Sequence, residues 1–104
     1  MKIKLSVFIV IILISVAVSA ASTPYKEIER IQFKADSGTL YIFNSSGWGV
    51  CDNSQYVQYT GSQANKDTFL SMVLAAHMAK RKVRFSGTCT EANNYLGTNY
   101  VYVN

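Results

Sequence analysis

Few side chains in this sequence are of a type that performs catalysis or binds a metal. The single histidine, His77, lies in the middle of an apolar segment, and the two cysteines, Cys51 and Cys89, flank that segment. One histidine and two cysteines are too few for a convincing zinc site. Nucleophile elbows, phosphate-binding loops and separated carboxylate pairs are not recognisable. We therefore expect no enzyme, no catalytic residues, no metal and no cofactor, with His77 as a structural or subunit-contact residue rather than a general base.

Ligand binding has more support in the sequence. Trp48 stands between two glycines in a polar loop, where an indole ring can stack on the apolar face of a sugar, and Asn44 and Ser46 can hydrogen-bond sugar hydroxyls. Tyr100 and Tyr102 alternate near the C-terminus, which places both on one face of a strand. These five residues are the predicted ligand site. Two alternatives stay open: Trp48 packs back onto the disulfide, and half-buried sheet positions explain the tyrosines.

The N-terminus has the pattern of an export signal. Lys2 and Lys4 precede an apolar run, and small residues up to Ala20 form a cleavage site. We expect residues 1–20 to be a signal peptide and residues 21–104 a single secreted or periplasmic domain. A permanent membrane anchor is the alternative, but the run is short for one, so we expect no stable membrane insertion after cleavage.

The charge of the chain argues against nucleic acid as a partner. Ten Lys and Arg residues stand against six Asp and Glu residues, and two of the lysines leave with the signal. The remaining positive charge is too small for nucleic-acid binding.

Export also decides the expected chemistry of the cysteines. A domain of this size has a marginal core, and small exported domains commonly add disulfides. Cys51 and Cys89 are the only cysteines, so one intramolecular pairing is available. We expect a Cys51–Cys89 disulfide rather than a catalytic thiol.

Hydrophobic periodicity predicts a mainly β (α+β) domain with one central helix. The expected strands have alternating or β-branched and aromatic residues, and they are residues 26–34, 39–43, 50–51, 56–59, 82–85 and 100–103. The spacing of Ile28 and Ile31 predicts an irregularity in the first of them. The helix is expected to begin at Asn65 or Asp67, either of which can cap it, and to run to about Lys80.

The predicted helix has almost no polar face. Phe69, Val73 and Ala76 form one apolar stripe, and apolar or small residues cover most of the remaining surface before Lys80. An ordinary surface helix shows a polar face. Either a neighbouring subunit covers the second side, or the helix is sunk deeply between curved strands.

The helix and its flanks resemble a known family. Residues 69–76 (FLSMVLAA), followed by residues 80–85 (KRKVRF), and the opening residues 31–33 and 38–42 are similar to small exported bacterial proteins related to the B subunits of subtilase-type and pertussis-like toxins. The resemblance implies an OB-like five-stranded barrel. It also implies a homo-oligomer, a pentameric ring in the toxins, whose helices line the pore, so Ser71, Ala75 and His77 are expected at subunit contacts.

The same resemblance implies a function. The toxin subunits bind sialylated glycans and carry an A-type subunit. This chain departs from them near its first strand, where Glu27 and Glu29 replace the Ser and Asp that hold the sugar carboxylate, and a carboxylate is poorly suited to an anionic sugar. We therefore expect a non-enzymatic exported binding protein that is toxin B-subunit-like and recognises a cell-surface glycan, with an A-type toxin subunit as a candidate partner. The alternative is an exported protein-interaction or inhibitor module that binds no glycan.

Overall fold

The computed structural model describes residues 20–104, so the predicted signal peptide lies outside the described residues except for Ala20. The fold is mainly β with one α-helix, as predicted. Its elements in chain order are β1 (Ala20–Ser22), β2 (Lys26–Glu27), β3 (Arg30–Lys34), β4 (Thr39–Phe43), β5 (Tyr56–Tyr59), the 3₁₀ turn η1 (Gln63–Asn65), α1 (Lys66–Met78), β6 (Lys82–Cys89) and β7 (Leu96–Val103).

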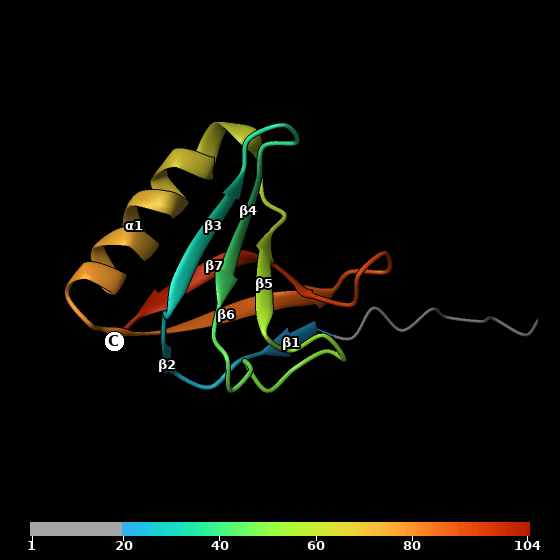
Figure 1. The fold of residues 1–104 in the computed structure, drawn as a ribbon, viewed down its shortest axis with the longest axis horizontal. Helices are drawn as coiled ribbons and strands as arrows, with labels where there is room; N and C mark the ends of the chain where they lie inside the picture. The colour runs from blue at the N-terminus through green and yellow to red at the C-terminus, as the bar shows by residue number, and fades with distance from the viewer. Residues whose placement is uncertain (1–19) are drawn as a thin grey trace, which may run out of the picture.

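The strands form one sheet in the order β1-β6-β7-β5-β4-β3, and β2 also pairs with β6. β5 and β7 are parallel, whereas the other pairs are antiparallel. Figure 1 shows β6 and β7 crossing behind β3, β4 and β5, with α1 along one side of the sheet. Within residues 20–104, hydrogen-bonded pairing does not close the sheet into a complete barrel.

The predicted irregularity in the first long strand is confirmed. The strand is divided at residues 28–29 into β2, which pairs with β6, and β3, which pairs with β4. Ile28 points into the core with 6% of its surface exposed, and the Glu29 amide donates to the Phe43 carbonyl at 3.1 Å. The bend therefore allows one short segment to join both ends of the sheet.

The last two strands are longer than predicted. Two glycines within them allow neighbouring backbones to approach closely, and they do not form a loop. A Cβ at Gly87 would lie 1.9 Å from the carbonyl oxygen of Gly97, and one at Gly97 would lie 2.9 Å from the Thr60 side chain. At this crossing β7 pairs with both β5 and β6. The sequence pattern predicted strands only over residues 82–85 and 100–103, and these bounds are wrong because the strands extend through Gly87 and Gly97.

Two short segments complete the fold, and the first of them differs from the prediction. Residues 50–51 form a bend instead of a strand, and Cys51 has a left-handed backbone with φ 62°. The segment around Pro24 follows β1, which pairs with β6. Thr23 fixes this segment to the sheet, since its amide donates to the Phe85 carbonyl at 2.9 Å and its hydroxyl accepts from the Phe85 amide at 3.0 Å.

The core lies between the two parts of the sheet and under α1. The predicted stripe of Phe69, Val73 and Ala76 is the buried face of the helix, as expected. The fully or almost fully buried side chains from other elements are Ile28, Leu40, Ile42, Trp48, Val57, Tyr59, Val83, Phe85 and Leu96. The helix begins after Asn65, whose side chain makes no capping hydrogen bond.

The outer face of α1 is exposed to solvent in the single chain. Met72, Leu74 and Met78 have 43%, 45% and 76% of their surfaces exposed. The alternative that the helix is sunk between curved strands is therefore wrong. No helix within residues 20–104 is long and apolar enough to cross a membrane.

Candidate functional site

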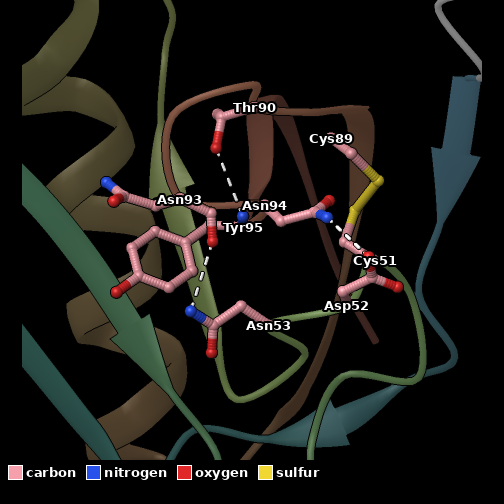
Figure 2. Close-up of a disulfide and its surroundings, with 8 residues drawn as sticks. All are labelled: Cys51, Asp52, Asn53, Cys89, Thr90, Asn93, Asn94 and Tyr95. Atoms are coloured by element: carbon pink, nitrogen blue, oxygen red, sulfur yellow. Dashed lines mark hydrogen bonds between the residues drawn. A yellow bond between two sulfur atoms is a disulfide. The ribbon is translucent and has the colours of Figure 1, made fainter.

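The predicted disulfide is confirmed. Cys51 and Cys89 are bonded, with their Cα atoms 5.6 Å apart, and residues 20–104 contain no free cysteine. The bond joins the loop after β4 to the end of β6, and both cysteines are only half-buried. Figure 2 shows the disulfide between this loop and the turn that leads into β7.

Trp48 is a core residue. Its side chain is 0% exposed, its indole Nε1 donates to the Ile42 carbonyl at 3.2 Å, and its ring lies 5.1 Å from that of Phe85 in an edge-to-face arrangement. A ring without exposed surface cannot stack on a sugar. The expectation that Trp48 binds a ligand by ring stacking does not hold here, and the ring packs on Phe85 instead.

Asn44 and Ser46 are also engaged in contacts within the protein. The side-chain nitrogen of Asn44 donates to the Glu27 backbone carbonyl at 2.8 Å. The side-chain oxygen of Asn44 accepts from the backbone amide of Ser46 at 3.0 Å and from the hydroxyl of Ser46 at 2.7 Å. Asn44 is buried, and the Ser46 hydroxyl also accepts from Lys26 Nζ at 3.2 Å. These hydrogen bonds fix the conformation of the loop, so Asn44 and Ser46 have few hydrogen-bonding groups left for a ligand.

Glu29 fastens the same loop to the bend between β2 and β3. Its carboxylate accepts hydrogen bonds from the amide and the hydroxyl of Ser45, the latter at 2.8 Å. Both bonds favour the ionised form, so they hold the pKa of Glu29 below its ordinary value, with the nearby Arg30 adding to the effect.

Tyr100 and Tyr102 lie on one exposed face of β7, as the alternation predicted. Their rings stack with centroids 6.5 Å apart, and the Arg84 guanidinium lies 5.2 Å from the centre of the Tyr102 ring. Tyr100 also borders a cavity of about 260 Å³ between α1 and β7, whose lining residues are Tyr59, Asn65, Thr68, Phe69, Met72, Asn99, Tyr100 and Val101. The two tyrosines are available to a ligand, but nothing brings them near Asn44 or Ser46.

The helix residues expected at a subunit contact divide into two groups. Ser71 and Ala75 are exposed on the outer face of α1. His77 is half-buried, and its Nδ1 lies 2.9 Å from the Ile28 carbonyl oxygen, which ties the helix to the bend between β2 and β3. His77 therefore makes a contact within the chain, while its expected place at a subunit contact stays a prediction.

A second cavity, which we call the tyrosine pocket, lies on the other face of the sheet from the core. It has a volume of about 220 Å³ and is lined by Gln32, Tyr41, Tyr56 and Tyr95. The Tyr95 ring lies 5.8 Å from that of Tyr41 and 5.4 Å from that of Tyr56, and the Tyr41 and Tyr56 rings are 6.1 Å apart. Each of these rings is half-buried, so each keeps an accessible surface.

Register explains how the strands form three sides of this pocket. Gln32 of β3 is opposite Tyr41 of β4, and Phe43 of β4 is opposite Tyr56 of β5. Leu40, Ile42 and Val57 alternate with these residues and point into the core. The outward residues of three neighbouring strands thus meet on one face.

Polar groups at the rim of the pocket remain able to bind a ligand. Arg30 lies 4.2 Å above the centre of the Phe43 ring, and it donates to the Tyr56 hydroxyl at 3.4 Å and to the side-chain oxygen Oε1 of Gln32 at 2.8 Å. The amide nitrogen of Gln32 and the hydroxyls of Tyr41 and Tyr95 bond to no group within residues 20–104. Ring faces, hydroxyls and an amide together suit a small ligand that has both an apolar face and hydroxyl groups.

This pocket was not predicted from the sequence, although part of the signal was present. Tyr41 and Tyr56 alternate with buried residues, which already places them on the outer face of their strands. Their meeting with Gln32 and Tyr95 depends on strand register and on the turn before β7. Within residues 20–104, no group of three or more His, Cys, Asp or Glu side chains is arranged to hold a metal ion.

Comparison with known proteins gives no match: none of the family models, curated proteins or solved structures that were compared is similar to this chain. The resemblance to toxin B subunits thus stays a prediction.

Proposed function

We propose that the chain is a non-enzymatic exported binding protein whose ligand is a glycan, and that the tyrosine pocket holds one sugar ring. The observation that carries the proposal is the group of three half-buried tyrosine rings, Tyr41, Tyr56 and Tyr95, around a cavity of about 220 Å³. Sites for drug-sized ligands are roughly 300–1,000 Å³. The smaller volume suits a single ring at the end of a chain.

The chemistry of the pocket supports this ligand class. A tyrosine ring offers an apolar face to the C–H groups of a sugar, and its hydroxyl can hydrogen-bond the sugar's own hydroxyls. The Gln32 amide adds a donor beside Tyr41, and the Arg30 guanidinium adds a positive charge at the rim. Tyrosine surfaces of this kind bind with little loss of side-chain freedom.

The proposal includes an OB-like fold and a homo-oligomer. Residues 28–29 join β2, on β6, to β3, on β4, so a single bent strand connects both ends of the sheet. The exposed apolar outer face of α1, with Met72, Leu74 and Met78, gives a surface that a second copy would cover. A ring of copies, such as the pentamer of the toxin subunits, would multiply weak glycan sites into avid binding and could carry an A-type subunit.

A glycan array tests the binding directly. We expect wild type to give signals for defined glycans and Tyr41→Ala to lose about tenfold or more of that signal, since one lost ring contact is close to a tenfold change. Tyr25→Ala is the matched control, because Tyr25 is an exposed tyrosine that does not line the pocket. A silent array for the folded wild type, or equal signals for the two variants, would refute the proposal.

The alternative function, a protein-interaction module, has support of its own in the free edge of β3. Among the strands of residues 20–104, β3 pairs only with β4, and Phe33 on this strand is 56% exposed. An exposed strand edge can pair with a strand of a partner. A stoichiometric protein partner recovered from the culture medium or periplasm, together with a silent glycan array, would favour this function.

A further inference from the structure

The turn between β6 and β7 is folded around Thr90 and presents Tyr95 to the pocket. The Thr90 amide donates to the Tyr95 carbonyl at 2.7 Å, the Thr90 hydroxyl accepts from the Tyr95 amide at 3.2 Å, and the Asn94 amide donates to the Thr90 carbonyl at 3.0 Å. Asn94 has a left-handed backbone with φ 56°. The direction of the Tyr95 ring therefore depends on a single tight turn.

A second loop holds this turn from the other side. The Asn94 side chain donates to the Asp52 carboxylate at 2.7 Å, the Asn53 amide donates to the Asn94 carbonyl at 3.1 Å, and the Asn53 side chain donates to the Asn93 carbonyl at 3.2 Å. The disulfide lies directly beside these bonds. Figure 2 shows the Tyr95 ring and the disulfide extending to opposite sides of the turn.

Tyr95 differs from the other residues of the tyrosine pocket in what positions it. Gln32, Tyr41 and Tyr56 lie within β3, β4 and β5, where ladder hydrogen bonds fix them. Tyr95 precedes β7, which begins at Leu96. One wall of the pocket thus depends on the turn and on whatever holds the turn.

We propose that the Cys51–Cys89 disulfide and the Asp52–Asn94 hydrogen bond position Tyr95, so that the tyrosine pocket binds its sugar ring only in the oxidised protein. This inference rests on the proposed function. Both cysteines are half-buried, which gives a small thiol access to the sulfurs. A dithiol reductant would transfer two electrons and two protons to the S–S bond, yielding two cysteine thiols and the oxidised, cyclic disulfide of the reductant.

Reduction would remove the covalent link between this turn and the loop of residues 51–53 without removing any residue of the pocket. Residues 51–53 would then be held to residues 93–94 by three hydrogen bonds alone. Hydrogen bonds at exposed sites exchange readily with water. Asn94 would be free to leave its left-handed conformation, which asparagine adopts more often than most residues but only as a minority state, and Tyr95 would move with it.

The first test measures the position of Tyr95 by NMR without any ligand. We expect nuclear Overhauser effects between the Tyr95 ring and the rings of Tyr41 and Tyr56 in the oxidised protein, and their loss after reduction by dithiothreitol or in the double variant Cys51→Ser, Cys89→Ser. Unchanged effects in reduced, folded protein would overturn the proposal.

The second test keeps the disulfide, in case its loss unfolds the chain. Asp52→Ala removes the acceptor for the Asn94 side chain, and we expect it to weaken binding of the strongest glycan on the array by roughly tenfold. We also expect weaker nuclear Overhauser effects between the Tyr95 ring and the rings of Tyr41 and Tyr56. Asp52→Asn retains an oxygen acceptor and should restore both. Glu91→Ala is the control, an exposed carboxylate on the same turn. Equal behaviour of Asp52→Ala and Glu91→Ala would contradict the proposal.

The two proposals fail in different ways. An oxidised wild-type protein that binds no glycan refutes the proposed function and, with it, the redox control of binding, while the Overhauser effects still decide whether the disulfide positions Tyr95. Glycan binding that survives reduction at full strength refutes the redox control and leaves the proposed function standing.

Discussion

The loop of residues 44–49 and the tyrosine pocket have similar kinds of side chains. In the loop these side chains make contacts within the protein, whereas in the pocket they remain accessible. The loop has an indole, an amide and hydroxyls, but Trp48 is 0% exposed and Asn44 bonds to Glu27 and Ser46. The pocket has rings, an amide and hydroxyls that remain accessible around a cavity. The comparison teaches that residue types suggest a binding site only when their polar atoms and ring faces are not already used by the fold.

The largest expected difference between the two regions is in stability. Trp48→Ala would leave a large cavity beside Phe85, so we expect the free energy of unfolding to fall by about 3–5 kcal/mol. Tyr41→Ala removes a half-buried ring and should cost only about 1–2 kcal/mol. Urea denaturation of both variants measures this. Equal costs would show that the pocket is as much a part of the core as Trp48 is.

Removal of the Asn44 amide should have a smaller effect. In Asn44→Ala the Glu27 carbonyl and the Ser46 amide lose their partner, and we expect a loss of about 1–3 kcal/mol because the site is buried. Ser46→Ala, at an exposed position, should cost less than Asn44→Ala. Reversed costs in thermal or urea unfolding would mean that the loop is not held through Asn44.

Removal of a pocket hydroxyl should affect binding and not stability. The Tyr41 hydroxyl makes no hydrogen bond within residues 20–104, so Tyr41→Phe should leave the free energy of unfolding within about 0.5 kcal/mol of wild type. We expect glycan binding, measured by titration calorimetry, to weaken by roughly fivefold, the effect of one hydrogen bond. Unchanged affinity would exclude this hydroxyl from ligand contact.

The smallest expected effect is the pH dependence of the loop. The hydrogen bonds from Ser45 hold the pKa of Glu29 below its ordinary value. At pH values between the lowered pKa and the ordinary pKa, the unfolded state therefore binds more protons than the folded state. This contribution to stability is fully present above the ordinary pKa of a glutamate and is lost as the pH falls through the lowered pKa. Glu29→Gln should abolish this part of the dependence, which comparison of melting temperatures between pH 3 and 6 would detect. A variant with the same acid dependence as wild type would contradict it.

Much of the fold could be predicted from local patterns. Alternation located β4 and β5, and apolar spacing located the buried face of α1 at Phe69, Val73 and Ala76. The disulfide was predicted from the number of cysteines and from the predicted export signal, and it is present. The extent of β6 and β7 was predicted wrongly because of Gly87 and Gly97. A glycine where two strands are in close contact has the same sequence signal as a glycine in a loop.

The site was harder to predict than the fold. The burial of Trp48 depends on Phe85, which is far away in the sequence, and the loop composition alone does not contain that contact. The tyrosine pocket joins residues from β3, β4, β5 and the turn before β7. Its formation requires the strand register and the clamp on the turn, neither of which is a local property.

The most direct measurement of the central claim is an NMR titration of ¹⁵N-labelled protein with the strongest glycan from the array. We predict that the largest amide shifts cluster at Gln32, Tyr41, Tyr56 and Tyr95, while residues 44–49 shift little. Shifts centred on residues 44–49 or on Tyr100 and Tyr102, with the pocket unaffected, would contradict the account.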